Sequence, residues 1–213
     1  MLVKPPKQKR DNMRNFTVVG QMVSLGFLFC GATEAADTMH VRGTVAAVDG
    51  SKVMVKTNDG KDVSLVLGDG WKIAGVTKAS MADIKQGTFI GTANMVGPDG
   101  AKALEVVVFP ESMRGTGEGD YGWDLKPHSQ MTNATVSSQV QSVDGQTVAL
   151  TYKGGEKKVK IAPNTPIVMI GSGTAADVKP GATVFISAPP GASADTLDKG
   201  FIAVGQDGAV PPM

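Results

Sequence analysis

The residues most able to do chemistry gather in one glycine-rich stretch, residues 110–133. This stretch lies between two longer regions whose apolar residues alternate as in β-strands. It combines acidic, basic and aromatic side chains, and long ordered connections of this kind often carry function. We therefore expect a ligand cleft at this loop, between two packed modules. The candidate ligand-binding residues are Glu111, Arg114, Glu118, Trp123, Asp124 and Asn133.

The same loop residues also fit a purely structural role. Trp123 is large enough to fill a gap between the modules. Arg42 and Arg114 are the only arginines beyond residue 35. In a chain that otherwise uses lysine, an arginine suggests a bidentate contact with a carboxylate or a phosphate. That partner is either a ligand or a loop carboxylate of the protein itself, and the sequence leaves both interpretations open.

A metal site is a second chemistry that the loop suggests. Met113, His128 and Met131 lie in or beside it, and thioether and imidazole groups together suit copper. Copper is therefore the one cofactor that we keep as an alternative. The chain has a single cysteine and two histidines, which excludes a disulfide framework and a zinc finger.

Enzyme motifs are weak in this sequence. Acidic pairs in the loop, Glu111 with Glu118 or Asp120 with Asp124, could supply an acid and a base. No G-x-S-x-G, H-E-x-x-H or phosphate-loop pattern occurs, and His128 has no partner at a motif spacing. We expect a non-enzymatic binding or interaction protein. A small enzyme that uses the loop carboxylates and His128 is the alternative.

The N-terminus has the order of a secretory signal peptide. A basic head precedes an apolar run at residues 16–30, and small residues follow. We predict a signal peptide over residues 1–35 and a periplasmic or secreted protein. The apolar run is shorter than the roughly 20 residues that span a bilayer, although an uncleaved anchor is the other interpretation.

Cleavage changes the charge of the chain and the partners that suit it. Residues 1–35 hold five basic and two acidic residues, so 16 basic and 18 acidic residues remain, a net charge of −2. The single cysteine, Cys30, also leaves. This balance argues against nucleic acid as a partner. A protein, a peptide or a saccharide is the expected ligand, no span is predicted after cleavage, and a homo-oligomer is possible.

The remaining chain contains an internal sequence repeat. V-A-A-V-D-G at residues 45–50 recurs as V-Q-S-V-D-G at 140–145, and A-D-I-K-Q-G at 82–87 recurs as A-D-V-K-P-G at 176–181. The offset is 95 for the first motif and 94 for the second. We infer an internal duplication, with modules at 38–109 and 134–208 and the loop at 110–133 between them.

Each module predicts a small β-barrel. Asp49-Gly50 flanked by alternating apolar residues is a hairpin signal, and residues 58–60 make a second turn. Ser80 and Asp83 have the spacing of a helix N-cap, with Gly87 as the stop. The predicted fold is all-β: two tandem five-stranded OB-like barrels, each with one short helix between strands 3 and 4. An SH3-like barrel or a small sandwich remains the alternative.

The twin V-D-G and A-D-[IV]-K-x-G motifs, with F-P-E-S-M-R-G-T-G-E-G at residues 109–119 and M-T-N-A-T-V at 131–136, resemble a known family. Its members are exported bacterial proteins of tandem small β-barrel modules of unknown function, and some are labelled "metal ABC transporter permease". The resemblance covers nearly all of the chain after the signal and implies a fold and a compartment but no activity. A permease needs several apolar spans, and the sequence has none after the predicted signal.

Overall fold

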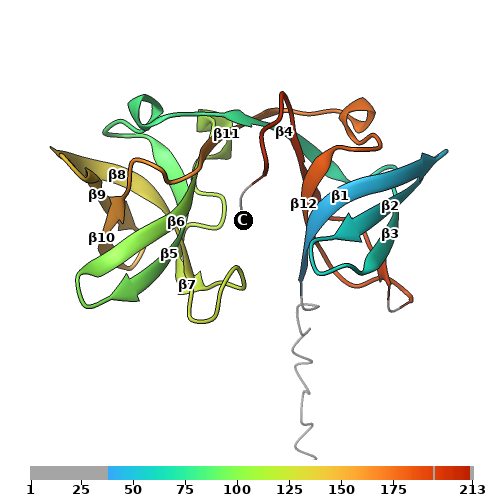
Figure 1. Cartoon of the computed structure of the whole chain (residues 1–213), viewed down its shortest axis with the longest axis horizontal. Coiled ribbons are helices and arrows are strands. Elements are labelled where there is room, and N and C mark those ends of the chain that lie inside the picture. The colour runs from blue at the N-terminus through green and yellow to red at the C-terminus, as the bar shows by residue number, and fades with distance from the viewer. Residues whose placement is uncertain (1–37, 194, 212–213) are drawn as a thin grey trace, which may run out of the picture. The chain divides into compact units, whose positions relative to one another are not determined.

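The computed structural model describes residues 38–193 and 195–211, so the predicted signal peptide lies outside the described residues. One continuous hydrogen-bonded network joins fourteen strands (Figure 1). The described ranges contain no α-helix, only three 3₁₀ turns, and no helix in them is long and apolar enough to cross a membrane. The all-β prediction is therefore confirmed, whereas the predicted short helices are 3₁₀ turns.

The elements follow one another in this order: β1 (Met39–Asp49), β2 (Lys52–Thr57), β3 (Asp62–Val66), β4 (Lys72–Lys78), η1 (Met81–Asp83), β5 (Phe89–Gly97), β6 (Gly100–Val108), η2 (Glu111–Met113), β7 (Gly119–Gly122), β8 (Gln130–Ser142), β9 (Gly145–Tyr152), β10 (Gly155–Ile161), β11 (Ile167–Ser172), η3 (Ala175–Asp177), β12 (Thr183–Ala188), β13 (Thr196–Leu197) and β14 (Phe201–Gly205).

Five strands close into a barrel in the order β10-β9-β8-β5-β6. Neighbours along this path pair antiparallel, and a parallel pairing of β10 with β6 closes it, with Val159 opposite Ala101. Closure pairs the two edge strands that an open sheet would leave exposed. Alternating apolar residues fill the barrel, among them Ile90, Val106 and Leu150, each with 0% of its surface exposed.

The barrel combines strands from both halves of the chain. It takes β5 and β6 from residues 38–109 and β8 to β10 from residues 134–208 and the residues just before them. The prediction of one barrel per module is therefore wrong. Hairpin signals predict which neighbouring strands pair, but they contain no information on which hairpins then join each other.

Six further strands follow the open path β14-β12-β1-β2-β3-β13 around a second apolar cluster. Here β13 pairs with β3 at only two positions, Thr196 with Ser64 and Leu197 with Leu65. Val45, Val53 and Ile202 are among the buried residues of this group. The described residues thus show one closed barrel and a second, open group of strands.

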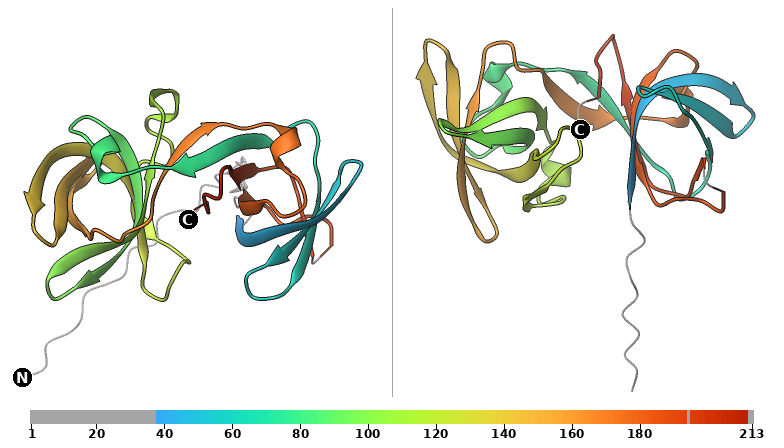
Figure 2. Two further views of the ribbon diagram at one scale, coloured as in Figure 1. Left: turned by 45° about the horizontal axis from the view of Figure 1, so that its top comes forward. Right: turned by 60° about the horizontal axis from the view of Figure 1, so that its bottom comes forward.

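Two strands, β11 and β4, link the barrel to the open group (Figure 2), and the sequence did not predict β4. β11 runs parallel to β6 and antiparallel to β4, and β4 runs parallel to β14. A third apolar cluster forms beside them and includes Val76, Phe89 and Phe185. This cluster provides the apolar floor under the loop at 110–133, because Met113 and Trp123 pack against it.

The N-cap predicted at Ser80 is confirmed at η1, and the same geometry recurs at Thr174 before η3. The Asp83 carboxylate accepts hydrogen bonds from the backbone N–H and the hydroxyl of Ser80, at 2.8 and 2.9 Å. Asp177 accepts the same two bonds from Thr174, at 2.8 and 2.9 Å. The backbone hydrogen bond, helped by the hydroxyl, lowers the pKa of each aspartate. The two turns therefore begin with the same local geometry, 94 residues apart.

Candidate functional site

The loop at residues 110–133 is attached to the barrel by strand pairing. β7 pairs antiparallel with the start of β8, and a tight turn follows it. In that turn the backbone N–H of Trp123 donates to the carbonyl of Ser129 at 2.8 Å, and the buried Ser129 hydroxyl contacts the carbonyls of Trp123 and Lys126 at 3.0 and 2.8 Å. These bonds fix the direction in which Trp123 and Asp124 leave the loop.

Trp123 packs on aromatic side chains from two strands of the open group. Its ring centroid lies 4.4 Å from that of His40 on β1 and 6.4 Å from that of Phe185 on β12. Tyr121 meets it edge-on at 6.3 Å. The indole is half-buried, and its Nε1 is buried without a hydrogen-bond partner among the described residues. The loop and the open group therefore meet through an aromatic cluster.

Asp124 is held by two cationic or polar groups of β1. Arg42 donates to both carboxylate oxygens, at 2.7 and 3.2 Å, and His40 Nδ1 lies 3.2 Å from Oδ2. Partial burial raises the pKa of Asp124, but the hydrogen bonds and charge of Arg42, with a smaller effect of His40, outweigh it and lower the pKa. The carboxylate is therefore held in its charged form, with 48% of the side chain exposed.

A cavity of about 810 Å³ opens beside this cluster. Its lining includes Tyr121, Trp123 and Asp124 from the loop, His40 and its cross-strand neighbour Ser187, and His128. Both histidines of the chain thus line one cavity. We call this space the Trp123 cavity.

His128 has an unusual backbone conformation at the rim of the Trp123 cavity. Its φ is +62°, in the left-handed region that residues other than glycine rarely occupy. Among the described residues, His128 and Asp207 are the only such non-glycine residues. Backbone conformations of this kind are costly and concentrate at functional sites.

The other predicted ligand residues tie the loop to the barrel instead. Arg114 makes a bidentate pair with Glu111, at 2.5 and 2.6 Å, and donates to the carbonyl of Gly87 at 2.8 Å and to Thr135 Oγ1 at 3.1 Å. The hydrogen bond from Arg114 lowers the pKa of Glu111. A Glu118 oxygen accepts the backbone N–H of Lys153 at 3.0 Å. None of these three predicted residues lines the Trp123 cavity.

Asn133 does not line the Trp123 cavity itself but contacts Tyr121, which does. It is 7% exposed, and its amide nitrogen lies 3.3 Å from both the carbonyl of Thr116 and the hydroxyl of Tyr121. Its side chain lies so close to Gly91 that a Cβ there would approach the Asn133 Oδ1 to 2.5 Å. Asn133 therefore orients Tyr121 and requires glycine on the neighbouring strand.

The structure places the three candidate metal ligands in different surroundings. Met113 packs on the third apolar cluster and lines a separate cavity with Phe201, whereas Met131 is 2% exposed within β8. Of the three candidate metal ligands, only His128 lines the Trp123 cavity. No group of three or more His, Cys, Asp or Glu side chains suited to a metal occurs in the part of the chain that the structure describes.

Sequence reasoning from the loop missed the groups that the open strands contribute. Arg42 and Phe185 lie opposite each other in the β1–β12 pairing, and the Arg42 guanidinium lies 5.3 Å from the centre of the Phe185 ring. Only the scarcity of arginine pointed to Arg42 beforehand. In comparisons with known proteins, no family model, curated protein or solved structure matches the chain, so the geometry alone supports an assignment.

Proposed function

We propose that this chain is a non-enzymatic binding protein whose Trp123 cavity holds a sugar ring of an oligosaccharide. The observation that carries the proposal is the meeting of Trp123, Tyr121, Asp124 and both histidines around one cavity. Aromatic faces suit the apolar face of a sugar ring, since they bury area without needing a charged ligand. A few polar groups at an apolar wall then orient the ligand.

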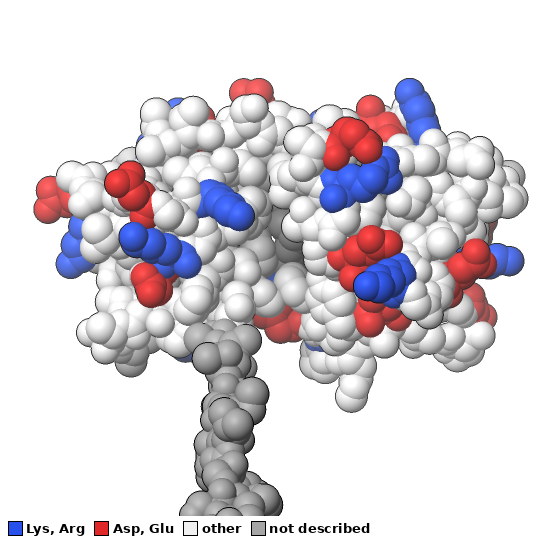
Figure 3. Space-filling view, turned by 180° about the vertical axis from the view of Figure 1, so that it is seen from behind, with Lys and Arg blue, Asp and Glu red and all other residues white. Residues whose placement is uncertain are grey.

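The polar groups match hydroxyls, which both donate and accept hydrogen bonds. The exposed half of the Asp124 carboxylate accepts, whereas the Ser187 hydroxyl and the His128 ring can do both. Arg42 already compensates the charge of Asp124, so a neutral ligand leaves no unbalanced charge in the cavity. On the face seen in Figure 3, Lys and Arg side chains lie beside Asp and Glu side chains, so this face carries charges of both signs.

The carboxylates of the loop are poorly suited to acid–base catalysis. A general acid at neutral pH needs a raised pKa, but the pKa values of Asp124 and Glu111 are lowered by Arg42 and Arg114 after allowance for burial. The Asp120 carboxylate accepts hydrogen bonds from the Thr132 hydroxyl at 2.7 Å and from the Lys157 ammonium at 2.8 Å. It therefore has different partners from Asp124, which is held by Arg42 and His40. These contacts support binding over the alternative of a small enzyme.

Copper binding is the second candidate, because His40 and His128 line the same cavity. The candidate methionines do not join them there, and His40 Nδ1 is already 3.2 Å from Asp124. A copper site would therefore depend on the two imidazoles without the predicted thioethers.

We further infer export and duplication from the sequence. The order of basic, apolar and small residues over 1–35 supports a signal peptide and a periplasmic or secreted location. The equal capping geometry at Ser80 and Thr174 supports two related halves, as does the recurrence of both motifs. Sequencing the N-terminus of the secreted protein tests the first inference, with a start at or near residue 36 as the expected result.

Calorimetric titration of residues 36–213 tests the function. We expect saturable heat with at least one of cellohexaose, chitohexaose and maltohexaose, and roughly tenfold weaker binding in Trp123→Ala. His128→Ala is the second variant. Within residues 38–193 and 195–211 the His128 side chain makes no hydrogen bond or ion pair, so weaker binding in this variant reports on the site and not on folding. Lys158→Ala, on the exposed face of β10, is the control. No heat from any of the three sugars overturns the proposal, and heat with copper that disappears in H128A replaces it.

A further inference from the structure

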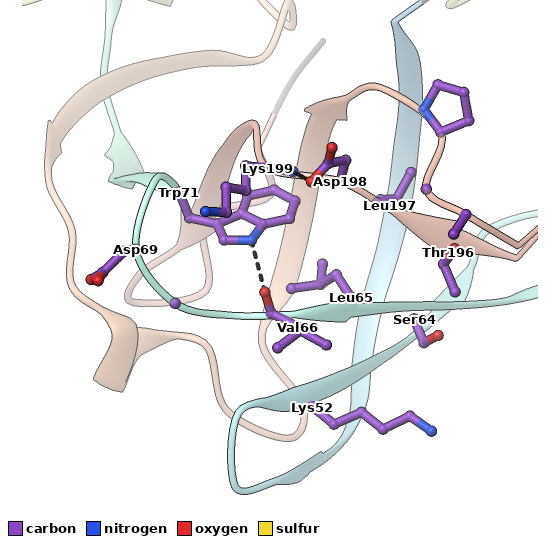
Figure 4. Close-up of a pocket in the computed structure, with 14 residues that line it drawn as sticks. Lys52, Ser64, Leu65, Val66, Asp69, Trp71, Thr196, Leu197, Asp198 and Lys199 are labelled. Carbon is purple, nitrogen blue, oxygen red and sulfur yellow. Dashed lines mark hydrogen bonds between the residues drawn. The ribbon is translucent and has the colours of Figure 1, made fainter.

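A second cavity lies in the open group of strands, at the other tryptophan of the chain (Figure 4). It encloses about 860 Å³ and is lined by the end of β3, by loop residues 68–71 and by the segment around β13. None of its residues belongs to the loop at 110–133. We call it the Trp71 cavity.

The cavity lies where the open group departs from the closed barrel. In the barrel the single strand β6 pairs with β10 near its start and with β11 near its end. In the open group β13 pairs with β3, and β14, which begins only at Phe201, pairs with β4. Residues 198–200 leave the sheet between the two strands, and the Trp71 cavity opens beside them.

Trp71 forms a fixed aromatic wall in this cavity. Its Nε1 donates to the carbonyl of Val66 at 2.9 Å, which holds the indole against the end of β3. The Val66 side chain beside it is 67% exposed, whereas Leu65 and Leu197 are buried below. The alkyl chain of Lys199 lies against Gly70, close enough that a Cβ there would come within 2.7 Å of it. A half-buried indole with an exposed valine offers a ready apolar surface to a ligand.

The rim of the cavity carries charges of both signs. The ammonium groups of Lys52 and Lys199 have no ion-pair partner among the described residues, and neither has the Asp69 carboxylate. One Asp198 oxygen accepts the backbone N–H of Lys199 at 2.8 Å. These four charges sum to zero, so a simple anion would meet carboxylates as well as amines. A neutral ligand with hydroxyl groups finds both donors and acceptors there.

We infer that the Trp71 cavity is a second saccharide site, so that the chain binds two short oligosaccharides, one at each of its two tryptophans. The ligand class rests on the proposed function, but the site does not, because its residues and its fluorescent reporter are separate. Lys52 and Lys199 donate to sugar hydroxyls from opposite sides of the cavity, and the ring packs on Trp71 and Val66.

Two single-tryptophan variants separate the sites, since the chain has only Trp71 and Trp123. Trp123→Phe keeps an aromatic ring and leaves Trp71 as the sole indole, and Trp71→Phe does the reverse. Titration with cellotriose, chitotriose and maltotriose is followed by tryptophan emission. We expect a saturable emission change in both variants, with the W123F response weakened about tenfold by the additional change Lys199→Ala and unaffected by Lys158→Ala.

The outcomes of the titration are distinguishable. A response in W71F with none in W123F overturns the second site and leaves the proposed function intact. A response in W123F alone keeps the Trp71 site and contradicts the Trp123 site. A W123F response to sodium decanoate without any response to the three sugars overturns the ligand class, because it indicates an amphiphilic anion.

Calorimetry of the protein with both tryptophans in place provides a test that does not depend on the folding of the W123F variant. With residues 36–213 and the sugar that binds, we expect two sites, one of which binds about tenfold more weakly in the single variant Lys199→Ala. A stoichiometry of one in the parent protein, unchanged by K199A, contradicts the inference.

Discussion

Asp124 joins the loop at residues 110–133 to the first strand, β1, through its side chain. Its carboxylate accepts two hydrogen bonds from Arg42 and lies beside His40 Nδ1. The same two β1 residues lie against the Trp123 ring, with the Arg42 guanidinium 5.9 Å from its centre. Asp124 therefore positions the wall of the cavity as well as contributing to it.

Asp124→Asn tests this contact through its pH dependence. Because the folded-state pKa is lowered, the contribution of Asp124 to stability is present above its unfolded value of about 3.9 and is lost as the pH falls through the folded value. The Asp124 side chain is about half exposed, so the loss at pH 7 should be about 1 kcal/mol or less. Melting temperatures of parent and variant should differ at pH 7 and converge in acid, once the pH lies below the lowered folded-state pKa of Asp124. An equal gap at both pH values would mean that the charge of Asp124 is not what stabilises the loop.

The substitution Arg114→Lys tests whether Arg114 has the structural role that its contacts indicate. Lysine in its place keeps the charge but cannot hold Glu111, Gly87 and Thr135 together in one plane. We expect Arg114→Lys to lower Tm by roughly 2–4 °C and to leave sugar affinity unchanged. Unchanged Tm with lost affinity would instead support the ligand role predicted from the sequence.

At the scale of elements, the site depends on the close approach of β5 to β8. Gly91 on β5 faces Asn133 on β8, and a methyl group there would meet Asn133 Oδ1 at 2.5 Å and Phe109 Cε2 at 3.0 Å. Gly91→Ala should therefore destabilise the protein by about 1–3 kcal/mol, because the barrel wall has no room to yield.

Gly171→Ala is the matched control for that substitution. Gly171 also lies within a strand, β11, but no atom lies within 4 Å of a Cβ placed on it. Chemical denaturation of both variants should show a large loss for G91A and a small change for G171A. Equal effects would show that strand glycines matter here through chain entropy and not through packing.

Local sequence signals explain some elements well and others not at all. Asp49-Gly50 marks the turn of the β1–β2 hairpin, and the Ser80 to Asp83 spacing marks a real cap. β4 and β7 escaped prediction because each holds glycine, which lowers strand propensity. Their pairing with distant strands, and not their own residues, makes them strands.

At the scale of the whole molecule, the closed barrel requires both halves of the chain. Residues 38–109 lack β8, β9 and β10, and residues 134–208 lack β5 and β6. No pattern in the sequence distinguishes this exchange from two separate barrels, since the same hairpins occur in both. Likewise the loop residues of the site were predictable from composition, but His40, Arg42 and Phe185 reach it only through long-range pairing.

Expression of the two segments as separate chains tests the exchange. We expect neither 38–109 nor 134–208 alone to melt cooperatively, because each lacks part of the barrel wall, whereas the two chains mixed should recover some cooperative melting. A cooperative transition in 38–109 alone would show that this module folds as its own barrel.

The most direct test of the account is a nuclear magnetic resonance titration of isotope-labelled residues 36–213 with the oligosaccharide that binds. We predict amide shifts at residues 38–42, 119–129 and 187, around the Trp123 cavity, and a second set at 64–71 and 196–199. The absence of shifts at residues 119–129, or a binding footprint centred on Glu111 and Arg114, would contradict it.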